Sequence, residues 1–333
     1  MSKLFPRLVV FSLVLALIVV AFGTAPVAAQ SGAQWCAGKT IRFFTGGAAG
    51  DAFGSIVQRG AQAAELDLGP TVEYIYSGWD VETMTNQLRE AIAARPDGIA
   101  MMGHPGDAAL MPLAEEAAAA GIVMMYQNVD VPEVRARFGG GYVGAQLAPQ
   151  GYALGAEAIR QYGFGAGDTA IVFIPIGQPG RDLREGATAQ ALRDAGMDVV
   201  VLDAAPEYAS DPNLALPPLT AAVLNNPNTR LIVYPGGQML SAVPVYMDAL
   251  GMAPGDIINI GFDTSPAIME AFSSGYVQLT SDQQPFLQGY LPILSLCGTL
   301  VFGFGPLNVD TGAGFVDTTN YQAVADLATA GYR

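Results

Sequence analysis

The sequence predicts an α/β protein built from two doubly wound parallel-sheet lobes. From residue 39 onward, short apolar runs alternate with longer amphipathic stretches, which is typical of repeated strand–helix–strand units. Ten such runs are too many strands for a single core of this kind. A length of 333 residues also corresponds to about two domains. Hydrophobic residues make up 51% of the chain and charged residues 14%, so enough apolar surface is available for two cores.

The apolar runs have the composition of strands. Each is rich in Val, Ile, Phe or Tyr, is bounded by Gly, Pro or Asp, and is continuous, as expected where helices cover both faces of a sheet. The first five predicted strands are Ile41–Thr45, Thr71–Tyr76, Gly98–Met102, Ile122–Tyr126 and Gly141–Gly144. The second five are Thr169–Ile174, Val199–Leu202, Arg230–Tyr234, Ile257–Gly261 and Val277–Thr280.

The stretches between the strands have helical periodicity. In residues 81–94 the apolar side chains recur at intervals of three and four, so they share one face of a helix. The predicted helices are Val81–Ala94, Ala109–Ala120, Gly151–Tyr162, Leu183–Ala195 and Met239–Leu250. Several stop at a glycine, which favours the left-handed conformation that ends many helices.

Charge and composition exclude several classes of protein. The 15 basic and 30 acidic residues give a net charge of −15, and so acidic a chain repels a phosphate backbone, which argues against nucleic-acid binding. His104 is the one histidine, and Cys36 and Cys297 are the two cysteines, too few for a zinc cluster or an iron–sulfur site. We expect no metal and no cofactor.

Residues 1–29 have the pattern of a secretory signal peptide. Lys3 and Arg7 precede an apolar run over Leu8–Phe22, and Val27–Ala29 offers a cleavage site of small residues. The alternative is a membrane anchor, but the run has about 15 residues where a bilayer needs roughly 20. Removal of the segment leaves 13 basic against 30 acidic residues, or −17. The sequence therefore predicts a soluble, exported protein.

Motifs for catalysis are weak. Residues 45–50 are glycine-rich but lack the spacing of a dinucleotide loop, and no phosphate-binding loop occurs elsewhere. A Ser/His/Asp triad would need His104, and no G-x-S-x-G elbow accompanies it, so a structural or hydrogen-bonding histidine at a cleft rim is the favoured interpretation. A pair of carboxylates for glycoside hydrolysis stays open, because acidic residues are plentiful. We assign no catalytic residue and expect no enzyme.

One set of residues carries a resemblance to a known family. Gly261-Phe262-Asp263 ends a strand, Gln283 follows twenty residues later, and Arg181 opens the helix after residues 171–177. With the two-lobe length and the signal segment, this chain resembles the ribose/galactose-type periplasmic sugar-binding proteins, the type I solute receptors of ABC importers, over residues 39–304. The resemblance implies three hinge crossings, near Ala145, Gln283 and Pro306.

The hinge implies how the chain divides. Residues 38–145 plus 284–305 would form the N-terminal lobe, and residues 146–283 plus 306–333 the C-terminal lobe. The resemblance also implies a monomer in the periplasm or on the extracellular face of the membrane. It would touch the membrane only through an ABC permease.

The resemblance places the ligand residues at strand ends. The residues it implies are Asp51, Phe53, Asn128, Arg181, Asp263 and Gln283, with Gln238, Tyr208, Trp79 and His104 as weaker candidates. Asn128 stands where the family usually has an aspartate. Gly236 stands where many relatives have a polar residue, so the side chain of Gln238 is expected to extend into the site instead. Physical chemistry supports this set, because Asp, Asn, Arg and Gln pair with sugar hydroxyls and an aromatic ring covers the apolar face of a sugar.

Each assignment has a simpler alternative. Asp263 would cap the helix that follows it, and Arg181 would pair with Asp182 or Glu185 on a solvated helix. Phe53 would be a core residue and Asn128 a turn residue. Gln283 would make only a hinge hydrogen bond.

The family resemblance and the compartment together predict a disulfide. Cys36 precedes the first strand, and Cys297 lies in a helix over residues 286–301 that the resemblance returns to the same lobe. The exported compartment is oxidising. The alternative is two separate thiols.

The leading hypothesis is therefore a receptor that closes around a monosaccharide or close polyol and delivers it to an ABC permease. Two alternatives stay open. One is a receptor for a furanose-like signal or a nucleoside, and the other is a secreted hydrolase of carbohydrate.

Overall fold

The computed structural model describes residues 34–178, 180–312 and 314–333, and the predicted signal peptide lies outside them. The first sheet has the order β11-β5-β4-β3-β1-β2, and all its neighbours run parallel. Its strands are β1 (Thr40–Gly46), β2 (Thr71–Tyr76), β3 (Gly98–Met102), β4 (Val123–Gln127), β5 (Gly141–Gly144) and β11 (Asn308–Asp310). The prediction of a parallel, doubly wound first lobe is confirmed.

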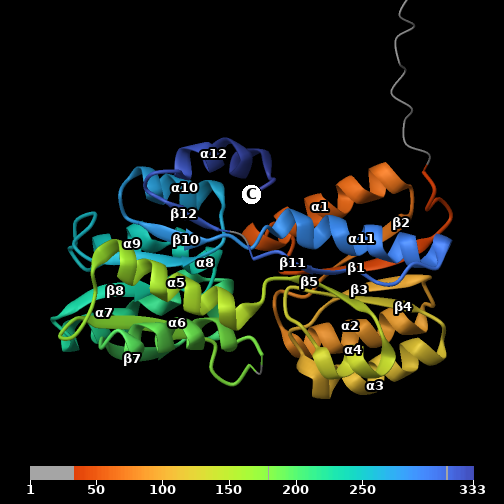
Figure 1. Cartoon of the computed structure of the whole chain (residues 1–333), viewed down its shortest axis with the longest axis horizontal. Helices are drawn as coiled ribbons and strands as arrows, with labels where there is room; N and C mark the ends of the chain where they lie inside the picture. The colour runs from red at the N-terminus through yellow and green to blue at the C-terminus, as the bar shows by residue number, and fades with distance from the viewer. Residues whose placement is uncertain (1–33, 179, 313) are drawn as a thin grey trace, which may run out of the picture. The chain divides into compact units, whose positions relative to one another are not determined.

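Helices cover both faces of this sheet (Figure 1). One face carries α1 (Ala52–Leu68) and α11 (Pro285–Phe302), and the other carries α2 (Val81–Ala93), α3 (Gly106–Ala119) and α4 (Pro132–Phe138). The central strand β3 is buried at all five positions, which explains its unbroken apolar run.

The second sheet has the order β12-β10-β9-β8-β6-β7, parallel except for β12. Its strands are β6 (Thr169–Ile174), β7 (Asp198–Asp203), β8 (Thr229–Val233), β9 (Ile258–Phe262), β10 (Leu279–Ser281) and β12 (Phe315–Asp317). Its α-helices are α5 (Leu147–Tyr162), α6 (Leu183–Asp194), α7 (Leu216–Asn225), α8 (Gly237–Ser241), α9 (Val243–Ala249), α10 (Pro266–Ser273) and α12 (Tyr321–Ala330). Two 3₁₀ turns, η1 (Pro206–Ala209) and η2 (Pro212–Ala215), follow β7. Helices α5 and α6 pack on one face, and the remaining helices form a second core on the other.

The helix expected over residues 239–250 is two helices. Helix α8 ends at Ser241, and α9 begins at Val243 with Pro244 in its first turn. A proline has no backbone N–H to donate to the carbonyl four residues earlier, so the helical ladder breaks there.

Three segments connect the sheets. The first runs from β5 to α5, the second from β10 to α11, and the third from β11 to β12. The third crossing was expected near Pro306, and this is wrong. After α11 the chain first adds β11 to the first sheet, with Val309 paired to Val143, so residues 306–310 lie with the first lobe and not the second.

Helices α1 and α11 approach each other closely. A Cβ on Gly60 would lie 1.9 Å from the carbonyl oxygen of Phe286, and one on Gly289 would lie 1.8 Å from that of Val57. Two glycines therefore permit backbone-to-backbone packing. The disulfide expected between Cys36 and Cys297 is present, with Cα atoms 5.5 Å apart, and it ties the start of the first lobe to α11.

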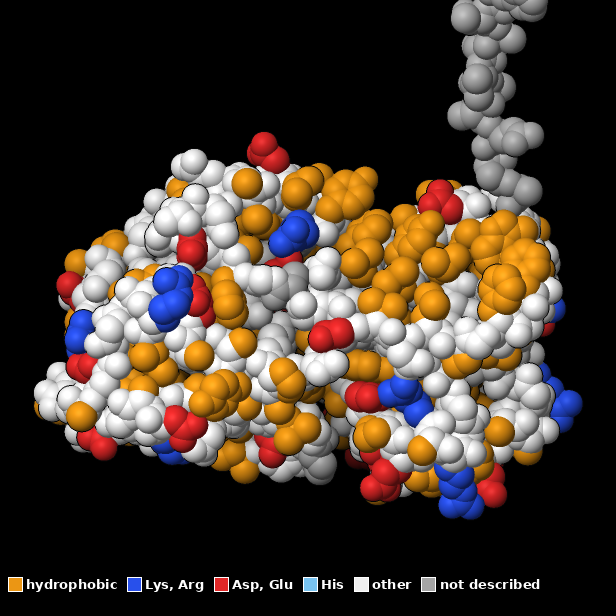
Figure 2. Space-filling view, viewed as in Figure 1, with side chains coloured by type: hydrophobic (Ala, Val, Ile, Leu, Met, Phe, Trp, Pro, Cys, Tyr) orange, Lys and Arg blue, Asp and Glu red, His pale blue; other side chains and the backbone are white. Residues whose placement is uncertain are grey.

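Helix α11 carries no charged residue and is long and apolar enough to cross a membrane by length and composition. Half of it is buried against the first sheet and α1. Figure 2 shows hydrophobic side chains gathered over the region of α1 and α11, and Leu66, Val301, Phe302 and Phe304 are the exposed large ones on these helices and just beyond them.

Candidate functional site

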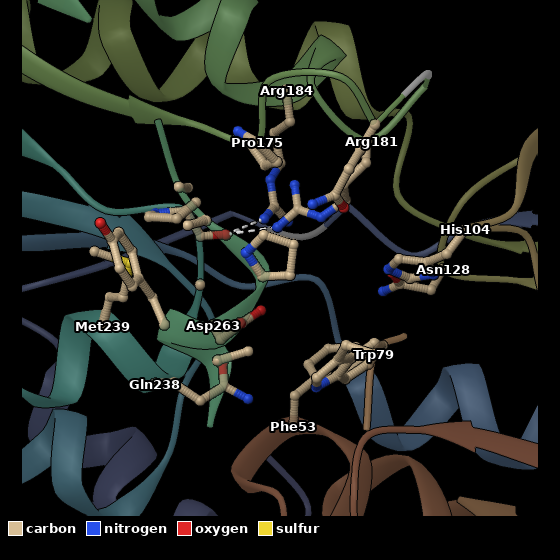
Figure 3. A pocket seen from close by; sticks show the side chains of 18 of the residues that line it. Phe53, Trp79, His104, Asn128, Pro175, Arg181, Arg184, Gln238, Met239 and Asp263 are labelled. Carbon is tan, nitrogen blue, oxygen red and sulfur yellow. Dashed lines mark hydrogen bonds between the residues drawn. The ribbon is translucent and has the colours of Figure 1, made fainter. Parts of the chain in front are cut away.

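A cavity of about 120 Å³ lies where the carboxyl ends of strands from both sheets converge. This is the place where open α/β sheets bind ligands. Nine of the ten predicted ligand residues line it: Phe53, Trp79, His104, Asn128, Arg181, Tyr208, Gln238, Asp263 and Gln283. Figure 3 shows the arrangement, with Arg181 and Arg184 together on one side, His104 beside Asn128, and Phe53 beside Trp79.

The arginines form a buried charge cluster. The Nη1 atom of Arg181 lies 3.0 Å from both carboxylate oxygens of Glu185, and the Nε atom of Arg184 donates to the same carboxylate at 2.9 Å. Both guanidinium groups also donate to the carbonyl oxygen of Pro235, at 2.8 and 2.5 Å. Arg181 does pair with Glu185, as its alternative supposed, but the carboxylate is fully buried instead of solvated.

Arg184 is a lining residue that the sequence analysis missed. Its guanidinium stands 3.9 Å from the centroid of the Phe262 ring, and burial lowers the pKa of Arg184 from its usual range. The signal was its position three residues after Arg181, at the start of α6, where both guanidinium groups reach the Glu185 carboxylate.

Asp263 is buried, follows β9 directly and has a positive φ of 78°. Its Oδ2 atom accepts from the backbone N–H of Gly237 at 2.9 Å, and its Oδ1 atom accepts from Gln283 Nε2 at 2.5 Å. The cap of α10 is Ser265 instead, whose Oγ atom accepts from the backbone N–H of Ile268. Asp263 therefore serves the cavity and not that helix terminus.

His104 is buried and its Nδ1 atom has no hydrogen-bond partner among the described residues. Burial, together with the nearby positive charges of Arg181 and Arg184, lowers the pKa of His104 to about 3. The ring is therefore neutral near pH 7, with one nitrogen donating and one accepting.

Two aromatic side chains form an apolar wall. The rings of Phe53 and Trp79 have centroids 5.9 Å apart, and the Trp79 ring lies 5.1 Å from that of His104. Gly46 has a φ of +88°, and a Cβ there would lie 2.3 Å from the indole, so this glycine makes room for Trp79. Phe53 faces both the core and the cavity.

Asp51 is placed differently from the sequence interpretation. It does not line the cavity, because its Oδ1 atom caps α1 at the N–H of Gly54, 2.6 Å away. Its Oδ2 atom accepts from Trp79 Nε1 at 3.0 Å and from the amide of Gln238. Asp51 therefore joins the first lobe to the second and orients the indole.

Gly236, which the resemblance had singled out as a site position, lines the cavity together with Gln238. Other lining residues gave no signal in the sequence. They are small or apolar residues of the second lobe and the hinge, namely Leu147, Pro175, Ala204, Ala205, Pro206, Ala209, Pro235 and Met239, together with Gln178. Within the part of the chain that the structure describes, no group of three His, Cys, Asp or Glu side chains could hold a metal ion.

Two parallel-sheet lobes around a polar, aromatic-lined cavity define a bilobal ligand-binding protein. Residues 43–300 match the model of the periplasmic binding protein domain, and the chain belongs to this family.

Solved structures share the fold. A carbohydrate transporter of Acidothermus cellulolyticus in complex with myo-inositol has a TM-score of 0.76 at 24% identity, covering 89% of this chain and 99% of its own. An ABC transporter solute-binding protein of Burkholderia graminis in complex with D-arabinose has a TM-score of 0.75 at 19% identity, covering 86% and 97%.

A curated relative matches a shorter stretch. The xylose/arabinose-binding protein of Sulfolobus acidocaldarius is 42% identical over 73 residues, which is 20% of this chain. The match spans 17% of that relative's length.

Proposed function

We propose that this protein is an exported solute-binding receptor that captures a neutral monosaccharide or polyol and delivers it to an ABC permease. The observation that carries the proposal is the charge balance around the cavity. Glu185 is ion-paired with both Arg181 and Arg184, the Asp263 carboxylate acts electrostatically on Arg184, and His104 is neutral. A sugar brings no charge and leaves this balance undisturbed, whereas an anion or cation would upset it.

Hydrogen-bonding capacity supports the same ligand class. Arginine only donates and an ionised Asp263 only accepts, so a ligand that touches both must do both, as a hydroxyl does. The faces of Phe53 and Trp79 suit the apolar C–H side of a sugar ring. The relatives described with arabinose, xylose and myo-inositol agree with this class.

The mechanism we propose is hinge closure. A sugar held by groups of both lobes binds the closed form better than the open form and therefore shifts the population towards it. The closed form would be the one that the permease recognises. The receptor would act as a monomer, which light scattering of the purified protein tests.

The test is a thermal-shift and calorimetric panel of D-xylose, L-arabinose and myo-inositol, with D-glucuronate and adenosine as charged and nucleoside comparisons. A sugar at 100 times its Kd adds about 2.7 kcal/mol to the free energy of unfolding. Binding of a neutral sugar and not of D-glucuronate is expected. Binding of D-glucuronate or adenosine alone would overturn the proposal.

The same panel separates a receptor from a hydrolase. Xylobiose and arabinobiose are incubated with the protein, and chromatography follows the release of monosaccharide. We expect unchanged disaccharide, whereas turnover that persists through purification would make the protein an enzyme.

A further inference from the structure

Asn128 presents one polar atom of its side chain to the cavity and engages the other inside the protein. The residue follows β4 in a left-handed conformation, with a φ of 66°, and is buried. Its Nδ2 atom donates to Gln283 Oε1 at 3.2 Å and to Gln288 Oε1 at 3.0 Å. Both hydrogens of the amide nitrogen are therefore in use.

Gln288 fixes this orientation from one end. It is fully buried in α11, and its Nε2 atom donates to the backbone carbonyl of Gln283 at 3.0 Å and to Thr311 Oγ1 at 3.0 Å. A backbone carbonyl only accepts, so the nitrogen of Gln288 must face it. The Oε1 atom of Gln288 is then left to face Asn128.

Gln283 fixes the orientation from the other end. Its Nε2 atom donates to the carboxylate of Asp263 at 2.5 Å, and an ionised carboxylate only accepts. The Oε1 atom of Gln283 therefore also faces Asn128. Two obligatory acceptors, the Gln283 carbonyl and the Asp263 carboxylate, thus force the same orientation on the Asn128 amide.

We propose that Gln288 is a positioning residue that holds Asn128 Oδ1 in the cavity as a fixed hydrogen-bond acceptor. The Oδ1 atom has no partner among the described residues, and Asn128 lines the cavity beside His104 (Figure 3). The ligand group that meets this atom must donate, as a hydroxyl does. A keto oxygen, a fluorine or a methyl ether at that point of the ligand is rejected.

This inference deepens the proposed sugar-binding function and rests on it for the ligand, but its first test needs no ligand. In ¹⁵N-labelled protein without sugar, both side-chain amide protons of Asn128 exchange slowly with solvent, and Gln288→Leu speeds their exchange at least tenfold. Asn128→Asp identifies the two signals by their loss. Fast exchange in the parent protein overturns the inference, whatever the protein binds.

The second test uses D-xylose, L-arabinose and myo-inositol, each with its monodeoxyfluoro analogues, in calorimetric titration. At one position of the sugar, fluorine weakens binding to the parent by about tenfold or more, because it cannot donate to Asn128. In Gln288→Leu only Gln283 still accepts from the Asn128 amide. The amide then turns more easily and presents its nitrogen, so the fluorine penalty at that position falls to about threefold or less.

Gln150→Leu is the matched control, because Gln150 is a buried glutamine whose amide donates to Ser281 and not to Asn128. It is expected to keep the parent's fluorine penalty. An equal penalty in the parent and in Gln288→Leu overturns the positioning role while leaving the sugar receptor intact. Failure of all three parent sugars to bind contradicts the proposed function instead, and the exchange experiment still decides the orientation of Asn128.

Discussion

The two lobes organise their sides of the cavity in different ways. The first lobe contributes neutral groups, the rings of Phe53, Trp79 and His104 and the amide of Asn128. The second lobe contributes charged groups, Arg181, Arg184 and Asp263, which already have partners inside the lobe or the hinge.

This difference assigns different tasks to the two sides. Because His104 Nδ1 and Asn128 Oδ1 have no partner within the described ranges of the chain, they would gain hydrogen bonds from a ligand. The guanidinium groups instead keep their hydrogen bonds within the protein and add hydrogen bonds to the ligand. We infer that the charged side chains of the second lobe form a charged platform, a set of groups that keeps its internal bonds when a ligand binds. The first lobe supplies the polar atoms whose hydrogen bonding depends most on the ligand.

The lobes also differ in what stabilises them. A disulfide ties Cys36 to α11 in the first lobe, whereas the second lobe holds a buried ion cluster around Glu185 and, among the described residues, no disulfide. Substitutions that remove either the disulfide or the ion cluster therefore test whether the two lobes are stabilised in different ways.

The largest effect is expected from Glu185→Leu. The change leaves two guanidinium groups without their carboxylate in a buried site, which destabilises the fold by about 3–5 kcal/mol. Urea unfolding measures the loss. The matched control is Glu157→Leu, because the Arg160 partner of Glu157 is 69% exposed and such a pair contributes about 1 kcal/mol or less. Equal losses in the two variants would contradict a charged platform.

Removal of the disulfide comes next. Cys36→Ser with Cys297→Ser frees a loop of 261 residues in sequence and is expected to lower the free energy of unfolding by about 2–4 kcal/mol. Hydrogen exchange should show faster opening in α1 and α11 than in α5 and α6. Uniform loosening of both lobes would show that the disulfide acts on the unfolded chain alone.

Much of the fold follows from the sequence because parallel strands covered on both faces require continuous apolar runs. Of the twelve strands in the part of the chain that the structure describes, ten have such runs, with small shifts at their ends. Strands β11 and β12 are three residues each and half polar, so only their pairing with β5 and β10 defines them. That is why the third crossing was placed too early, at Pro306 instead of beyond Asp310.

The candidate site was predictable where a residue's place is fixed by a strand end. Asn128 and Asp263 directly follow strands, and both line the cavity. The direction of a side chain was not predictable where tertiary partners decide it. Asp51 follows β1 as expected, but the N–H of Gly54 and the indole of Trp79 turn its carboxylate away from the lining.

Arg181→Ala sharpens the comparison at the level of binding. The loss of a charged donor weakens binding of the neutral sugar found in the panel by about 2–3 kcal/mol. Glu185 keeps its bond to Arg184, so the unliganded melting temperature should shift by only a few degrees. Calorimetric titration measures the affinity, and Glu115→Ala on the exposed face of α3 is the control. Affinity within twofold of the parent would make Arg181 a structural residue only.

The smallest effect on stability is expected from His104, the neutral ring beside Trp79, and it appears when the pH is changed. The pKa of His104 is about 3 in the folded protein against 6.5 in the unfolded chain, so below pH 6.5 the unfolded chain binds a proton that the folded protein does not. Stability therefore falls as the pH falls, by about 1.4 kcal/mol per pH unit and about 2 kcal/mol between pH 6.5 and pH 5. Since His104 is the one histidine of the chain, no other imidazole contributes. In His104→Asn this part of the pH dependence should vanish, as measured by urea unfolding at pH 5, 6 and 7. If the free energy of unfolding had the same pH dependence in parent and variant, His104 would be protonated as readily in the folded protein as in the unfolded chain. The first lobe's side of the cavity would then not be neutral.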